Sequence, residues 1–255
     1  MYSNLRVERL DAIAIVTLDN PPVNAISFAA YDEIRQAFHQ LAEDDDLRAI
    51  VLTGAGDRVF CGGNDVRDFV ELDYEGATEA LAGVRISYNA IIDCPIPIVA
   101  AINGAAVGTG LVLPTLCDIR LASSEAVFAL PEIDVGVLGG GKHLMRVATL
   151  GMTRLMMYTG RRIGALEAQR IGMVDEIHPP ERLLEAAIEL AREIASKSPA
   201  AIRLAKLGLT RVETMGMKEA YEYECTLTAE VRRTPEAREA AMAFLEKRQP
   251  RFLEA

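Results

Sequence analysis

In the first half of the chain, short extended apolar runs alternate with stretches that have helical spacing. The apolar runs predict strands at Leu5–Leu10, Ile13–Leu18, Ala49–Thr53, Ile98–Ile102, Ile119–Ala122 and Val127–Ala129. Helical spacing predicts one helix from Phe28 to Glu43, capped by Ser27, and another from Thr78 to Ile92. A third helix is expected to begin near Leu111–Val112 or to carry a local defect, because Pro114 is comfortable only within a first turn.

From Gly140 onward the pattern predicts helices, with one short extended piece at Val174–Ile177. The helical stretches are Gly151–Thr159, Ala165–Ile171, Glu181–Lys197, Ala200–Thr210, Met217–Arg232 and Pro235–Lys247. Alternation of strand and helix followed by helices alone predicts an α/β core at residues 1–195 and a helical region at residues 196–255.

Composition narrows the class of protein. The chain has 255 residues, 50% of them apolar, which is typical of a folded protein with a large core. A net charge of −10 argues against a nucleic-acid partner. The four cysteines and three histidines are scattered, so we expect reduced thiols and no metal site. No apolar run is long enough to span a membrane and no signal core begins the chain, so a cytoplasmic protein is expected.

Two glycine-containing stretches carry the candidate chemistry. They are Phe60–Val66 and Ile98–Gly110, and each places glycines directly after an apolar run. Glycine lets bare backbone N–H groups approach a ligand closely. If the two turns converge, two backbone donors can share one oxygen atom, which is an oxyanion hole suited to a thioester enolate. The alternative is that these glycines only allow a strand and a helix to pack tightly.

The sequence of one other stretch, Gly136–His143, nearly matches the motif of a phosphate-binding loop. Its last position is His143, where a Ser or Thr would bind Mg²⁺, and the nearest predicted strand is too distant. We therefore expect an adaptable loop that enters the next helix, and not a nucleotide site.

Six stretches, taken in order, resemble the crotonase superfamily, also called the enoyl-CoA hydratase/isomerase family. They are Asp19–Ile26, Ala49–Val66, Pro97–Asp118, Ala129–Gly136, Tyr158–Ile177 and Phe244–Phe252. The resemblance implies an α/β fold, a spiral of ββα units with a helical C-terminal part that forms trimers, often paired into hexamers. It also implies an acyl-CoA thioester substrate and no separate cofactor, since CoA is part of the substrate.

The resemblance also assigns site residues. The backbone N–H groups of Asn64 and Thr109 match the oxyanion donors, and Glu132 matches a catalytic glutamate. Substrate-binding positions are expected at Ala25, Arg58, Gly63, Arg67, Gly108, Val112, Phe244 and Lys247. A local cationic patch is needed because CoA carries phosphates and the protein is acidic. Phe244 and Lys247 match positions that touch the adenine end, in a neighbouring subunit of a trimer.

Val112 departs from the family pattern, because hydratases carry their first glutamate there. Hydration is best served by two carboxylates around one water, whereas isomerisation of an enoyl-CoA needs one base. A single-glutamate site therefore favours isomerase chemistry. Asp134, His143 and Asp68 are candidates for a substitute acid, and Lys142 with His143 lies where small residues are common, beside the acyl pocket.

Several alternatives stay open. The chain can still be a hydratase, or it can hydrolyse a thioester, decarboxylate or cleave a C–C bond, as other members of the superfamily do. It can also be a catalytically silent CoA-binding protein. Val112 favours this last interpretation, whereas the retained Glu132 argues against it.

Overall fold

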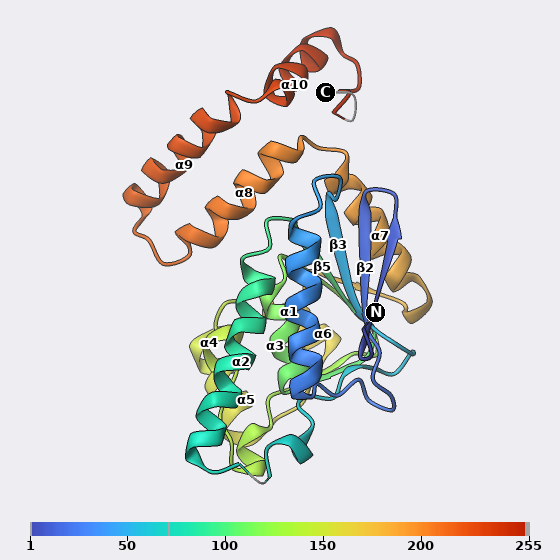
Figure 1. Ribbon diagram of the computed structural model, residues 1–255, viewed down its shortest axis with the longest axis vertical. Helices are drawn as coiled ribbons and strands as arrows, with labels where there is room; N and C mark the ends of the chain where they lie inside the picture. Colours follow the sequence, from blue (N-terminus) through green and yellow to red (C-terminus); the bar gives the residue numbers. More distant parts are fainter. Residues whose placement is uncertain (1, 71, 253–255) are drawn as a thin grey trace.

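The computed structural model describes residues 2–70 and 72–252 and has two β-sheets flanked by helices (Figure 1). Residues 1, 71 and 253–255, which belong to the two predicted regions, lie outside the described part. The fold is the predicted α/β class, so that expectation is confirmed.

The larger sheet has the strand order β1-β2-β3-β5-β7-β10. Its strands are β1 (Leu5–Leu10), β2 (Ile13–Leu18), β3 (Ala49–Gly54), β5 (Ile98–Ile102), β7 (Ile119–Ser123) and β10 (Glu176–His178). Only the β1–β2 pair in this order is antiparallel; the other neighbours run parallel. Parallel neighbours need crossover connections, and the smaller sheet and the helices supply them.

The smaller sheet has the order β4-β6-β8-β9. Its strands are β4 (Val59–Cys61), β6 (Ala105–Val107), β8 (Val127–Ala129) and β9 (Ile163–Gly164). From β3 to α5, one strand of the large sheet is followed by one of the small sheet and then by one or more helices, with α2 after β4 and α3 after β6. This repeated order is the expected spiral of ββα units.

Ten α-helices complete the described part of the chain. They are α1 (Phe28–Ala42), α2 (Tyr74–Ile92), α3 (Thr109–Leu116), α4 (Gly141–Leu144), α5 (Leu150–Thr159), α6 (Ala165–Arg170), α7 (Pro180–Ala195), α8 (Pro199–Val212), α9 (Met217–Val231) and α10 (Pro235–Glu246). Two 3-10 turns, Val66–Asp68 and Glu132–Val135, lie between these elements. The Ser27 hydroxyl accepts from the Ala30 N–H at 3.2 Å, as the predicted cap requires.

Alternation along β3 divides the interior between two layers. Ile50 and Leu52 point into the main core with α1 and α2, whereas Ala49 and Val51 pack against α7 on the opposite face. All four side chains are at most 1% exposed, because a central parallel strand is covered on both faces.

Several sequence-based boundaries were wrong. Helix α2 begins at Tyr74 and not at Thr78, because the Asp73 side chain accepts from the Gly76 N–H and caps an earlier turn. The extended piece expected at Val174–Ile177 lies at Glu176–His178. The short strands β4, β6 and β9 were missed, since strands of two or three residues leave no periodic signal.

Of the two alternatives expected for α3, a start near Leu111–Val112 was wrong, and a local defect at Pro114 is what the structure has. The helix begins at Thr109 and contains Pro114 in its interior. The proline removes one helical hydrogen bond, but every residue of α3 is buried, so tertiary packing holds the helix despite that loss.

The last three helices, α8, α9 and α10, form a helical arm that projects away from the sheets (Figure 1). Helix α7 ends at Ala195 and α8 begins at Pro199, with the Ser198 side chain capping α8. Helices α9 and α10 both contact α8. Exposed apolar side chains line these helices, including Leu207, Leu209, Met217, Tyr221, Phe244 and Leu245.

Candidate active site

The first glycine turn, Gly62–Gly63, follows β4 and places Asn64 three residues beyond the end of that strand. Ile26 forms a parallel bridge to Asn64, in which its N–H donates to the Gly63 carbonyl at 2.8 Å and its carbonyl accepts from Asp65 at 3.0 Å. In a parallel bridge the bonded groups belong to the residues on either side of the bridged one, so the Asn64 N–H points away from Ile26. Gly63 has a φ of 103°, which glycine tolerates best.

The second glycine turn places Thr109 at the start of α3. Gly108, with a φ of 58°, separates β6 from the helix. The first N–H groups of a helix have no partner within it, and they form its positive end. The Thr109 N–H is therefore available to an external acceptor that carries negative charge.

The two turns lie against each other. A methyl group placed on Gly63 would lie 3.0 Å from the Val107 carbonyl oxygen and 3.9 Å from the Gly108 Cα. Beyond the glycines, the Thr109 hydroxyl donates to the Asn64 side-chain oxygen at 2.8 Å. The structure thus brings residues 64 and 109 together, as the sequence analysis expects.

Two buried tyrosines complete this group, and sequence reasoning missed them. Tyr31 of α1 donates to Asn64 Oδ1 at 2.6 Å, and its hydroxyl lies 2.9 Å from Thr109 Oγ1. Tyr88 of α2 lies 3.1 Å from the same Thr109 oxygen. Tyr31 lies on the buried, mostly apolar face of α1, with Ile34, Phe38 and Leu41. Nothing in the helical spacing distinguishes a hydrogen-bonded tyrosine from an ordinary core aromatic.

Glu132 lies beside the second turn. It begins the 3-10 turn Glu132–Val135, and its Oε1 would be 3.0 Å from a methyl group on Gly108. Its Oε2 is buried and has no hydrogen-bond partner within the described structure. Burial raises the pKa of this carboxyl above its usual 4.5. A half-buried carboxyl with a raised pKa is suited to both accepting and donating a proton.

Val112 is buried one turn into α3, at 3% exposure. Its Cγ2 would lie 2.7 Å from a methyl group on Gly140, so the valine packs closely against the loop that enters α4. The position therefore presents an apolar side chain one helical turn after Gly108 and supplies no polar group.

The candidates for a substitute acid differ in their surroundings. His143 is half-buried, its ring packs edge-on against Tyr88 at 5.4 Å, and burial lowers its pKa below 6.5. Asp68 instead accepts from the Phe28 N–H at 2.8 Å in the first turn of α1. Asp134 and Lys142 are exposed. His143 is thus the candidate that contacts Tyr88, whose hydroxyl lies next to Thr109.

The residues expected near CoA are spread along the surface. Ala25 is half-buried and precedes Ile26, which pairs with the first turn. Arg58 is exposed in the loop before β4. Arg67 is 89% exposed at its side chain and pairs with Asp65 at 2.5 Å, so part of its charge is already neutralised.

Phe244 and Lys247 are not brought to the site within one chain. They lie on or just after α10, which projects away from the sheets (Figure 1). Phe244 is 84% exposed, so it does not pack into the core of its own chain. Their expected contact with CoA therefore requires a neighbouring subunit.

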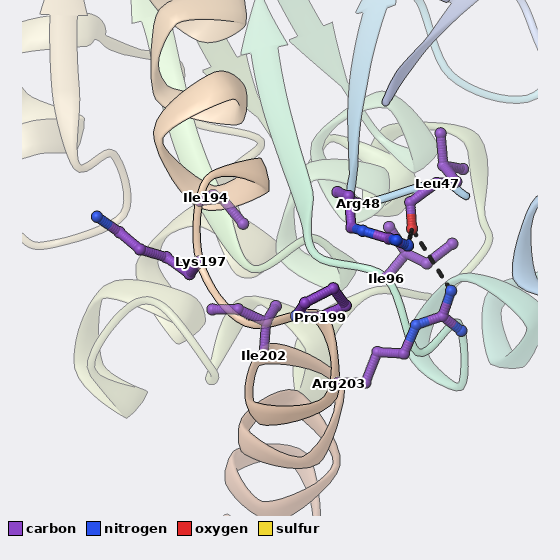
Figure 2. A pocket seen from close by; sticks show the side chains of 8 residues that line it. All are labelled: Leu47, Arg48, Ile96, Ile194, Lys197, Pro199, Ile202 and Arg203. Atoms are coloured by element: carbon purple, nitrogen blue, oxygen red, sulfur yellow. Dashed lines mark hydrogen bonds between the residues drawn. The ribbon is translucent and has the colours of Figure 1, made fainter. Parts of the chain in front are cut away.

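A separate pocket lies where α7 meets α8 (Figure 2). Arg203 of α8 donates there to the carbonyls of Asp44 at 3.1 Å and Leu47 at 3.4 Å. None of the expected site residues lines this pocket, whose arginine contacts join the helical arm to the core. Within the described residues, no three His, Cys, Asp or Glu side chains gather in a way that would hold a metal, and no helix could cross a membrane.

Comparison with known families matches residues 8–255 to the enoyl-CoA hydratase/isomerase family. A short-chain-enoyl-CoA hydratase of Clostridium acetobutylicum is 32% identical over 251 residues, covering 96% of each chain. A (7aS)-7a-methyl-1,5-dioxo-2,3,5,6,7,7a-hexahydro-1H-indene-carboxyl-CoA hydrolase of Rhodococcus jostii is 35% identical over 242 residues, covering 94% of this chain and 93% of the relative.

Solved structures agree with this assignment. An enoyl-CoA hydratase of Bacillus anthracis superposes with a TM-score of 0.94 at 32% identity, covering 98% of this chain and 99% of the other. An enoyl-CoA hydratase of Mycobacterium smegmatis gives the same TM-score at 30% identity, covering 98% and 99%. The match extends over both the sheets and the helical arm.

Proposed function

Because the chain belongs to the enoyl-CoA hydratase/isomerase family, we propose that it acts on an acyl-CoA thioester through an enolate held by the Asn64 and Thr109 N–H groups. Glu132 is the acid/base of this reaction. The observation that carries the proposal is the position of the Glu132 carboxyl, half-buried against Gly108, directly before the Thr109 donor.

The favoured reaction is isomerisation of a 3-enoyl-CoA to a 2-enoyl-CoA. The Glu132 carboxylate removes a proton from C2, and the electron pair moves into the thioester carbonyl to give a dienolate. The two N–H groups stabilise the negative oxygen, each by roughly 3–4 kcal/mol. The Glu132 carboxyl then returns the proton to C4, and the double bond forms between C2 and C3. No water enters, so one carboxyl group suffices.

Val112 supports this choice over hydration. A hydratase site needs a second group that holds and activates water, and the packed valine at this position offers no donor or acceptor. Of the three residues considered as a substitute for the missing glutamate, His143 is the one whose ring contacts Tyr88.

CoA binding is proposed to use Arg58 and Arg67 around the first turn. Arg67 must exchange its Asp65 partner for a phosphate, whereas Arg58 is exposed. Phe244 and Lys247 then contact the adenine end from the adjacent subunit of a trimer, or of a hexamer made from two trimers, with no separate cofactor.

A screen of CoA thioesters with product identification by mass spectrometry tests the proposal. Incubation with 3-hexenoyl-CoA is expected to give a product of unchanged mass that absorbs as a conjugated enoyl thioester. Crotonyl-CoA is expected to gain the mass of water slowly or not at all. Fast hydration of crotonyl-CoA, with no isomerisation, would overturn the isomerase assignment.

A second candidate is hydrolysis of a CoA-bound substrate, which is favoured by the Rhodococcus jostii relative, because that protein is named as a carboxyl-CoA hydrolase. Release of free CoA, detected with a thiol reagent in the same screen, would identify thioester hydrolysis. Tight binding of thioesters without turnover of any of them would identify a CoA-binding protein.

A further inference from the structure

The two residues proposed to supply the oxyanion donors also touch through their side chains. Thr109 Oγ1 donates to Asn64 Oδ1 at 2.8 Å, although the two residues lie on separate turns, 45 positions apart. We propose that these side chains and Tyr31 form a clamp that fixes the spacing of the two backbone N–H groups. This inference rests on the proposed function and assigns positioning roles to Tyr31 and to both side chains.

Counting hydrogens sets the direction of the network. The Asn64 amide oxygen accepts two hydrogen bonds, from Tyr31 at 2.6 Å and from Thr109 at 2.8 Å, which uses both of its lone pairs. Thr109 has then donated its only hydroxyl hydrogen. Tyr31 has likewise donated its only hydroxyl hydrogen. The Tyr88 hydroxyl therefore donates to one of these two oxygens, to Thr109 at 3.1 Å or to Tyr31 at 3.3 Å.

Tyr31 holds the clamp rigidly. Its side chain is 2% exposed, and its own carbonyl accepts from the Ser87 hydroxyl at 2.8 Å. Burial raises the pKa of the Tyr31 hydroxyl far above its usual range, so it stays a donor at every working pH. Helices α1 and α2, which contact each other, thus fix the Asn64 side chain through Tyr31 and Ser87.

The glycine turns explain why a clamp is needed. Gly63 and Gly108 immediately precede the two donors, and both have positive φ values, 103° and 58°. Glycine has more conformational freedom than other residues, so the peptides that follow can reorient. Oxyanion stabilisation depends on donors that are already aimed, and a shift of about 1 Å can lower a rate roughly a hundredfold.

Binding of acetoacetyl-CoA can show how strongly the two N–H groups stabilise an enolate, and it requires no turnover. Its enolate absorbs in the near ultraviolet, so titration at fixed pH gives both a dissociation constant and the enolate-to-keto ratio of the bound thioester. The variants are Tyr31→Phe and Thr109→Val, with Thr109→Ser retaining the hydroxyl. Tyr2→Phe is the matched control, since it removes a phenol that donates at 2.8 Å to Gln40, far from the site.

We expect Tyr31→Phe and Thr109→Val to lower the bound enolate-to-keto ratio at least about tenfold while the dissociation constant changes little. Tyr2→Phe should stay close to the wild type, and Thr109→Ser, which keeps the hydroxyl, should recover most of the enolate enrichment that Thr109→Val loses. In turnover of 3-hexenoyl-CoA the same two variants should lose kcat more than KM. Circular dichroism melting shows whether each variant is folded. If only one of Tyr31→Phe and Thr109→Val is folded, that variant alone is enough for the test.

The outcomes separate the two proposals. If the wild type binds acetoacetyl-CoA without enriching the enolate, or does not bind it, the proposed function fails and the clamp fails with it. If the wild type enriches the enolate and folded Tyr31→Phe and Thr109→Val match it, the clamp alone is overturned. Loss in Thr109→Ser equal to that in Thr109→Val would also overturn it, because shape and not the hydroxyl would then be responsible.

Discussion

Replacing Glu132 with glutamine should abolish most activity and at the same time stabilise the folded protein at neutral pH. The amide has nearly the same shape as the carboxyl, so the contact with Gly108 is retained. It cannot accept and return a proton. General acid–base groups typically contribute roughly 10²–10⁴ in rate, and we expect kcat to fall by that factor while KM changes little.

The stability gain follows from the carboxyl's burial. Glu132 Oε2 is buried without a partner, and burial raises the pKa of the folded-state carboxyl above 4.5. A raised folded-state pKa means that the folded protein disfavours the ionised form. This cost lowers the free energy of unfolding by its full amount at pH values above the folded-state pKa. It disappears as the pH falls below about 4.5, which is the usual pKa of the carboxyl in the unfolded chain. Glu132→Gln removes this pH-dependent cost.

A buried donor or acceptor without a partner typically costs about 1–3 kcal/mol, and a charged one costs more, so the neutral amide removes the part of the cost that comes from the charge. A domain of this size changes its melting temperature by about 2–4 °C per kcal/mol. Thermal melting at pH 7.5 should therefore place Glu132→Gln above the wild type, and melting near pH 4 should show a smaller difference. In parallel, wild-type kcat/KM should decline as the pH falls through the raised pKa of Glu132, because the base becomes protonated.

Two results would refute this reasoning. Turnover of 3-hexenoyl-CoA by Glu132→Gln within about threefold of the wild type would remove Glu132 from the mechanism, since general acid–base groups typically contribute far more. If Glu132→Gln is inactive but less stable than the wild type at neutral pH, the carboxylate must have a partner in the folded protein. The raised pKa could then not be explained by a buried oxygen without a hydrogen-bond partner. Tyr2→Phe again serves as a control, because its hydrogen bond lies outside the site.

Other consequences of the structure can be tested together. Val112→Glu should raise hydration of crotonyl-CoA as measured by mass spectrometry, and no gain in a folded variant would mean that the missing carboxylate does not limit hydration. Gly108→Ala should lower kcat and cost about 1–3 kcal/mol of stability, because alanine at a φ of 58° is strained and its methyl crowds Glu132; unaltered kcat and melting would contradict the assigned geometry. Lys206→Met should cost about 1.5–3 kcal/mol in urea unfolding, since Lys206 is 7% exposed and donates to Asp118 at 2.8 Å. An unchanged unfolding midpoint would show that this pair contributes nothing.

Local patterns were sufficient for much of the fold. The apolar runs of β3 and β5 identify central strands because both faces of a parallel sheet are covered. Glycine after those strands marks the turns, since few other residues adopt the backbone angles of Gly63 and Gly108. Glu132 was identified by its resemblance to a family position, and in the folded protein burial raises its pKa.

Sequence patterns alone therefore predict the longer elements in their order, the two turns and the family, but not the short strands β4, β6 and β9. Which side chains meet depends on tertiary packing. Tyr31 reaches Asn64 across 33 positions and Thr109 across 78, and no local periodicity reports a hydrogen bond over such separations. Tertiary structure likewise places Phe244 on a helical arm away from the sheets. Burial preference and turn geometry are local properties of a chain, whereas the meeting of two polar groups depends on how every intervening element packs.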